Sequence, residues 1–146
     1  MGLLGCAAPK APGPLQLVGD RWELVAITSM DDAQPPWKPA DSSRYWIEFG
    51  SDGRLLLKLD CNNGRSSWQS EPAPDANPAR RAGNLQLGAL VTTRVACPPG
   101  SLEPKLTALL PFVRSYVIEN GQLHLSLMAD GGVLSWKPVA PSAPVR

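Results

Sequence analysis

Apolar and polar residues alternate over much of this chain, and a two-residue repeat of this kind is typical of half-buried β-strands. The segment 21–28 shows it first, with Trp22, Leu24 and Ala26 on one face and Val25 and Ile27 on the other. We therefore predict a strand over these eight residues, with the tryptophan side directed toward a core.

Two hairpins follow from the same repeat. The arms 45–49 and 54–60 flank a turn rich in glycine and aspartate, and in the second arm Leu55, Leu57 and Leu59 share one side. The arms 115–119 and 122–128 flank the pair Asn-Gly, a favoured two-residue turn. Further short strands are predicted at 84–87, 91–95 and 133–136.

The period changes once, after Ser101. One helical stripe is formed by Leu102, Leu106, Leu109, Leu110 and Val113. Ser101 suits an N-cap and Pro111 ends or bends the helix, so we predict a helix near 101–111. About eight short strands and one helix indicate a mostly β fold with a minor α part: a small antiparallel β-barrel or curved sheet whose open end the helix covers.

Length and proline content set the domain boundaries. A chain of 146 residues suits one domain with tails, and its 16 prolines are high. We predict a Pro-rich tether at 1–16, a domain at 17–137 and a loose Pro-rich tail at 138–146. The net charge of +1 provides no basic footprint, so nucleic-acid binding is not expected. A monomer is expected.

The N-terminus carries a candidate lipidation site. Leu3, Leu4, Gly5 and Cys6 resemble the bacterial lipobox, which implies cleavage before Cys6 and a lipid anchor on its thiol. A full secretory signal needs a longer apolar stretch than the five residues before Cys6. A start further upstream and a chance cysteine both stay open as alternatives.

Several blocks together resemble the META domain, the family of the HslJ-like bacterial lipoproteins. They cover about residues 15 to 137 and comprise Leu17-Val18-Gly19, Trp22, Leu24, Phe49–Arg54, Cys61-Asn62-Asn63 and Thr93-Arg94-Val95-Ala96-Cys97. One departure is Asp60, which stands where the family commonly has glycine. The resemblance implies a lipocalin-like barrel in a cell-envelope protein, without a known catalytic activity or cofactor.

On this resemblance we expect a non-catalytic lipoprotein of the outer membrane, facing the periplasm, that binds a partner or helps to maintain the envelope under stress. A carrier of a small apolar ligand, or an inhibitor of an envelope enzyme, is the alternative. A barrel interior filled by leucine and tryptophan side chains would count against a carrier.

Cys61 and Cys97 are expected to form a structural disulfide, because two cysteines of one small domain normally pair in an oxidising compartment. A redox-active pair is expected at closer spacing, and a metal site lacks further ligands because His124 is the single histidine. No metal or cofactor is expected. His124 lies on the polar side of its predicted strand, where a solvent-facing role is favoured over a catalytic one.

Such a disulfide would bring two polar loops together at a barrel rim. The candidate binding residues there are Asn62, Asn63, Thr93 and Arg94. The alternative is structural: an asparagine caps the turn after Cys61, and Arg94 pairs with Asp60 or a carbonyl group. Trp37, between two prolines, is the tryptophan expected to be exposed to a partner.

Overall fold

The structure is a computed structural model that describes residues 16–73 and 80–140. The described residues form nine strands, one α-helix and two short 3₁₀ segments. The strands are β1 Arg21–Thr28, β2 Tyr45–Phe49, β3 Arg54–Leu59, β4 Asn62–Pro72, β5 Arg80–Leu87, β6 Val91–Thr92, β7 Val113–Glu119, β8 Gln122–Leu127 and β9 Val133–Val139. The helical elements are η1 Ser42–Arg44, α1 Glu103–Leu109 and η2 Leu110–Phe112.

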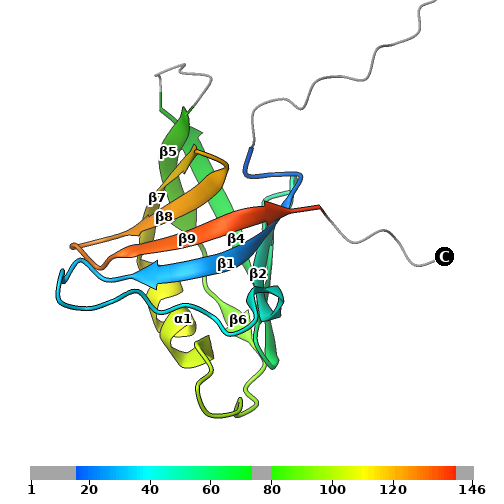
Figure 1. The fold of residues 1–146 in the computed structure, drawn as a ribbon. Coiled ribbons are helices and arrows are strands. Elements are labelled where there is room, and N and C mark those ends of the chain that lie inside the picture. The colour runs from blue at the N-terminus through cyan, green and yellow to red at the C-terminus, as the bar shows by residue number, and fades with distance from the viewer. Residues whose placement is uncertain (1–15, 74–79, 141–146) are drawn as a thin grey trace, which may run out of the picture.

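Eight of these strands close into an antiparallel barrel (Figure 1). Their order is β3-β2-β1-β9-β8-β7-β5-β4, and β4 pairs in turn with β3. The ninth strand, β6, lies outside this ring, on the part of β4 that β5 does not reach. The prediction of a small antiparallel barrel is confirmed.

Strand alternation places the core as the sequence pattern predicts. In β3, Leu55, Leu57 and Leu59 are at most 2% exposed, whereas Leu56 between them is 48% exposed. The leucines of β8 are likewise buried. In the turn before β8, Asn120 and Gly121 have φ of 53° and 74°, as a two-residue hairpin of type I′ requires.

The first strand differs from the prediction at one position. The sequence pattern predicts Ile27 on the outer face, but its side chain is only 2% exposed. The pairing of β1 with β9 shifts register between Leu24 and Ala26, and such a bulge turns the next side chains to the other face.

The longest strand, β4, has no counterpart among the predicted strands. Its half-buried positions are Gly64, Ser66, Trp68 and Ser70, so the apolar alternation is absent. Two neighbouring strands also have different bounds: β5 begins at Arg80 rather than at residue 84, and β6 ends at Thr92 rather than at residue 95.

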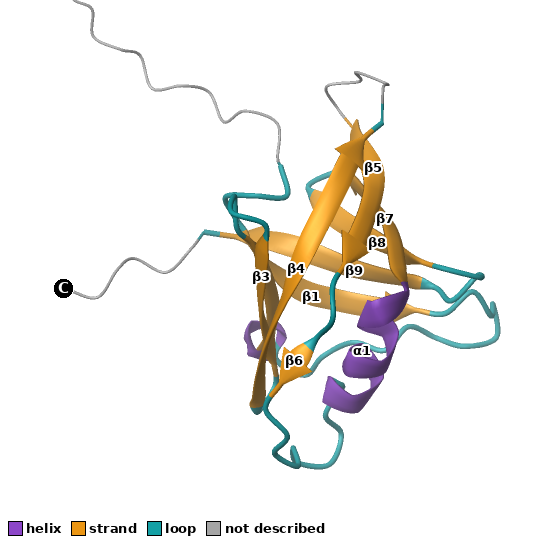
Figure 2. Ribbon diagram, turned by 180° about the vertical axis from the view of Figure 1, so that it is seen from behind, coloured by secondary structure: helices purple, strands orange, loops and turns teal. Residues whose placement is uncertain are grey.

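The helix covers one end of the barrel, as predicted (Figure 2). The helix proper begins at Glu103, whose N–H donates to the Ser101 hydroxyl at 3.1 Å. At Leu110 it tightens into η2, which contains Pro111. Leu106 and Leu110 are at most 2% exposed, so they fill the barrel end.

The strand β9 runs two residues past the predicted domain end at 137. Pro138 and Val139 pair with Trp22 and Arg21 of β1. Cys6 and most of the predicted tether and tail lie outside the described residues, so those predictions stay predictions. In the described part of the chain, no helix has the length and apolar character needed to cross a membrane.

Candidate functional site

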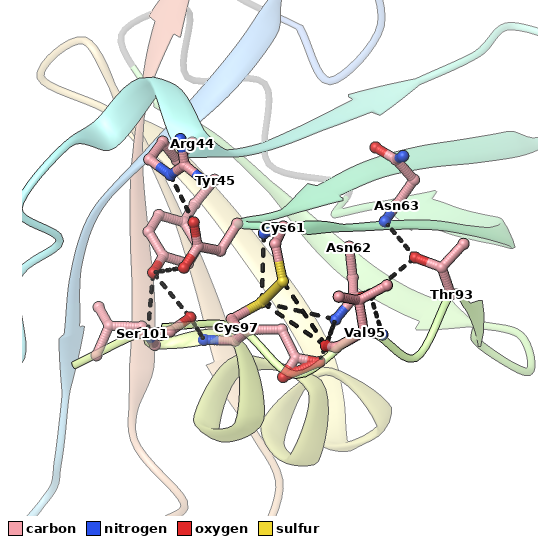
Figure 3. The surroundings of a disulfide bond; sticks show 12 residues. Arg44, Tyr45, Cys61, Asn62, Asn63, Thr93, Val95, Cys97 and Ser101 are labelled. Carbon is pink, nitrogen blue, oxygen red and sulfur yellow. Dashed lines mark hydrogen bonds and ion pairs between the residues drawn. A yellow bond between two sulfur atoms is a disulfide. The ribbon is translucent and has the colours of Figure 1, made fainter. Parts of the chain in front are cut away.

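A disulfide joins the start of β4 to the loop that follows β6 (Figure 3). Cys61 and Cys97 are bonded with a sulfur–sulfur distance of 2.04 Å and their Cα atoms are 5.5 Å apart. The predicted pairing is confirmed. The bond closes a segment that spans 36 positions and fixes the loop 93–102 against the barrel.

Asn62, the next residue, holds the same loop with its side chain. Its Nδ2 donates to the Val95 carbonyl at 2.9 Å, and its Oδ1 accepts from the Val95 N–H at 2.8 Å and from the Thr93 hydroxyl at 2.9 Å. Nδ2 also lies 3.2 Å from Glu103 Oε1. Asn62 is 1% exposed. It therefore fastens the loop from inside and is not available at a rim as a binding residue.

Its neighbour Asn63 lies on the opposite side of β4 and is exposed. The Asn63 N–H donates to the Thr93 hydroxyl, and the Thr93 N–H donates to the Asn63 carbonyl, both at 3.0 Å. Arg94 is exposed, and no ion pair of it is found in the described part of the chain. The expected alternative pairing of Arg94 with Asp60 is wrong, because a different arginine takes that carboxylate.

That arginine is Arg44, whose Nε lies 2.5 Å from Asp60 Oδ1. Asp60 is 6% exposed, and the Tyr45 hydroxyl donates to its second oxygen at 3.3 Å. The Tyr45 hydroxyl also accepts the Leu102 N–H at 2.9 Å. The pKa of Asp60 lies below its usual range. The hydrogen bond with the Ser101 hydroxyl lowers it most, and Arg44 and Tyr45 lower it further, although burial opposes this. A second set of bonds thus holds the loop 93–102.

The backbone of Asp60 explains its departure from the family pattern. Its φ is 61°, in the left-handed region where glycine is favoured, and aspartate tolerates that region better than most residues. The carboxylate is fixed by the contacts just described. Glycine has no side chain and could not make these contacts. Asp60 therefore combines a left-handed backbone conformation, which favours glycine, with a carboxylate that is held by hydrogen bonds and an ion pair.

Trp37 lies elsewhere, beside the end of β1. Its N–H and carbonyl pair with Ile27 at 3.0 and 2.9 Å, and the Lys105 ammonium lies 4.1 Å from its ring centroid. The side chain is half-buried against the core. The expectation of an exposed Trp37 is wrong, and it is not part of a common site with Asn63 and Thr93.

Asn63 and Thr93 do lie together, on the outer surface of β3, β4 and β6. Leu56 pairs with Arg65, which pairs with Val91, and Lys58 pairs with Asn63 in the next row. We call this surface the basic–apolar face, defined by Leu56, Lys58, Asn63, Arg65, Val91 and Thr93. An open hollow of about 310 Å³ lies on it. Its lining is Leu56, Asn63, Gly64, Arg65, Val91, Thr92 and Thr93.

The sequence matches a known protein family. The model of the META domain matches residues 15–140. The chain belongs to the META domain family. No curated protein matches it. Among solved structures, a DUF4847 family protein from Bacteroides vulgatus ATCC 8482 is similar, with a TM-score of 0.53 and 10% sequence identity. The alignment covers 83% of this chain and 93% of that one, and at this identity the likeness concerns the fold.

The interior of this META domain is filled. Trp22, Trp136, Leu24, Leu59 and Leu123 are each 0% exposed. A hollow of about 10 Å³, lined mainly by leucines of β3, β5 and η2, is smaller than a drug-sized ligand needs. The described barrel therefore has side chains where a lipocalin-like carrier would have ligand.

A second hollow of the META domain, of about 500 Å³, lies over β4, β5 and the start of β7. The strand pairing of β5 with β7 ends at Asn84 and Ser115, and the strands separate beyond this point. The lining consists of Gln69, Ser70, Glu71, Asn84, Gln86, Val113, Arg114 and Met128. This lining mixes amides with both charges, whereas the basic–apolar face carries positive charge alone.

Elsewhere in the META domain, His124 is half-buried and its Nδ1 lies 2.9 Å from the Ser135 hydroxyl on the neighbouring strand. Within residues 16–73 and 80–140, no three His, Cys, Asp or Glu side chains gather as metal ligands would. Sequence reasoning found Asn63 and Thr93 but missed Leu56, Lys58, Arg65 and Val91. Their alignment depends on strand register, which the sequence pattern does not give.

Proposed function

We propose that this META domain protein is an HslJ-like lipoprotein of the bacterial outer membrane, facing the periplasm, that acts by binding rather than by catalysis. In this role it contributes to maintenance of the envelope under stress. Cys6 carries the lipid anchor, and the basic–apolar face makes the contact. The resemblance of Leu3–Cys6 to a lipobox supports the anchor, and membership of the META family agrees with an envelope protein.

One observation carries the binding role: apolar and positive side chains are presented together on an outer face, while the interior is packed. Leu56 and Val91 are 48% and 58% exposed. Exposed aliphatic groups in register with a cation are typical of an interaction surface. The rigid attachment of the neighbouring loop by Cys61, Cys97 and Asn62 keeps Thr93 in place on this face.

The filled interior counts against the carrier alternative. A carrier needs a cavity for its ligand, and the residues that line the barrel of the described chain leave about 10 Å³ near the leucines of β3. An inhibitor of an envelope enzyme would also act through an outer surface. It is a special case of the binding role, distinguished by its target.

The anchor and compartment are tested by the intact mass of the product of the complete native gene, expressed in a Gram-negative host. We expect cleavage before Cys6, addition of lipid, and a gain of two hydrogen atoms on reduction. A C6S variant is the control and should stay unmodified. An unprocessed N-terminus with three free thiols would contradict the proposed location.

A further inference from the structure

The basic–apolar face combines two properties that select the chemistry of its partner. Its apolar residues are aliphatic and well exposed: Leu56 at 48% and Val91 at 58%. Its charged side chains are Arg65, which pairs with Leu56, and Lys58 in the next row. A partner must therefore be negatively charged and must also accept aliphatic side chains.

The charge is not neutralised within the face. Among the described residues, none of those that line the hollow is acidic. An acidic residue of the same row, Glu48, pairs with Leu56. Its carboxylate lies 2.6 Å from the Nε of Arg21, which is on β1, the strand on the side of Glu48 away from Leu56. Arg65 forms no ion pair with any of the residues that the structure describes. Its guanidinium is free to meet a phosphate group.

The shape of the face favours an extended surface over a single small molecule. The hollow lies on the outside of three adjacent strands, whose paired residues Leu56, Arg65 and Val91 share one row. We propose that this face docks on an anionic phospholipid surface. Lys58 and Arg65 contact the phosphates, and Leu56 and Val91 enter the boundary between headgroups and acyl chains. The proposal rests on the binding role proposed above for the same face.

Composition favours lipid over an acidic protein segment. Interfaces between proteins are enriched in aromatic residues and depleted of lysine, and the basic–apolar face has lysine and no aromatic side chain. Trp46, in the row of Lys58 and Asn63, is covered by the Arg21 guanidinium, 3.9 Å from its ring centroid. Aliphatic side chains among lysine and arginine are typical of surfaces that lie on anionic membranes.

Vesicle binding tests the proposal with the complete chain carrying C6S, so that an acyl anchor does not contribute. The probes are sedimenting vesicles of phosphatidylglycerol and of phosphatidylcholine. We expect binding to phosphatidylglycerol only, weakened by added salt because screening shortens the range of the charges. R65Q should lower the affinity by about fivefold, the effect of one cation near an anionic surface.

R114Q is the matched control, since Arg114 is also exposed and lies in the second hollow beside Glu71. It should leave vesicle affinity unchanged. Equal binding to both lipids, or equal losses in R65Q and R114Q, would overturn the proposal. If neither vesicle binds but R65Q abolishes crosslinking of the chain to an envelope protein, the lipid assignment fails and the binding role stands. If R65Q changes neither readout, both fail.

Discussion

The inner and outer sides of β3 and β4 both carry leucine and asparagine, but these residues have different roles on the two sides. On the inner side, Leu55 is 1% exposed and Asn62 is 1% exposed with its amide fully bonded. On the outer side, Leu56 is 48% exposed and Asn63 directs its side chain to solvent. The neighbours differ by one position along the strand.

The contrast shows that residue type alone does not assign a role in a sheet. Successive side chains point to opposite faces, so a shift of one residue exchanges core for surface. The inner asparagine fastens the loop 93–102, whereas the outer one belongs to the basic–apolar face. A mutation on the inner side should act on stability, and a mutation on the outer side should act on binding.

Removal of the disulfide breaks the inner side most severely. The C61S/C97S double variant should lose about 3 to 4 kcal/mol in free energy of unfolding, because the bond restricts a long loop in the unfolded chain. Unfolding in guanidinium chloride measures this loss. Reduction of the wild-type protein is the control and should give a similar decrease. A loss below about 1 kcal/mol in both experiments would refute the fastening role of the bond.

Replacement of each asparagine by alanine compares the two sides of β4 directly. N62A should destabilise the fold by about 2 to 3 kcal/mol, since it removes the buried amide that bonds the Val95 N–H and carbonyl. N63A should change stability by less than about 0.5 kcal/mol, as is usual for exposed positions. Thermal unfolding of both variants gives the answer. Similar losses for the pair would mean that the sides of β4 are not distinct.

Low pH should lower the stability of the fold through protonation of Asp60. Its pKa is lowered in the folded protein, so its ionised form stabilises the fold above the pKa of the unfolded chain, about 4, and this stabilisation is lost as pH falls below that value. D60N should therefore be less stable than wild type at neutral pH, and the difference should shrink in acid. Unfolding midpoints measured across this pH range test it. A constant difference would show that the carboxylate charge is not what matters.

A smaller loss than that of N62A concerns Trp37, which the structure places away from the basic–apolar face. K105M should cost about 0.5 to 1 kcal/mol, the contribution of a half-exposed cation over an indole ring. The quantity to compare is the unfolding free energy. Vesicle affinity should not change, and a loss of affinity in K105M would extend the binding surface to α1.

Much of the barrel could be predicted from its strands with alternating leucines. β3, β8 and the Asn120–Gly121 turn follow from local pattern, because each strand has one buried and one exposed face. β4 could not be predicted this way: Gly64 and Ser66 face the interior where neighbouring strands supply the apolar volume. Tertiary packing there replaces the local signal.

Only part of the candidate site could be predicted from the sequence. Asn63 and Thr93 are adjacent to the two cysteines, so a disulfide brings them together. Leu56 and Val91 come from strands that are not consecutive, and only the pairing through Arg65 aligns them. The anchoring of Asp60 by Arg44 and Tyr45 also depends on the fold. The presence of aspartate where the family commonly has glycine is the one sequence signal that could have revealed it.

The most direct test of the two-sided account is paramagnetic broadening of side-chain methyl signals by a spin-labelled phosphatidylglycerol bicelle. One NMR experiment on the C6S chain compares leucines that are neighbours in β3. The account predicts the strongest broadening at Leu56 and Val91, weaker broadening at Leu55 and Leu57, and none at Met128. Broadening of Met128, which lines the second hollow, without broadening of Leu56 would contradict it.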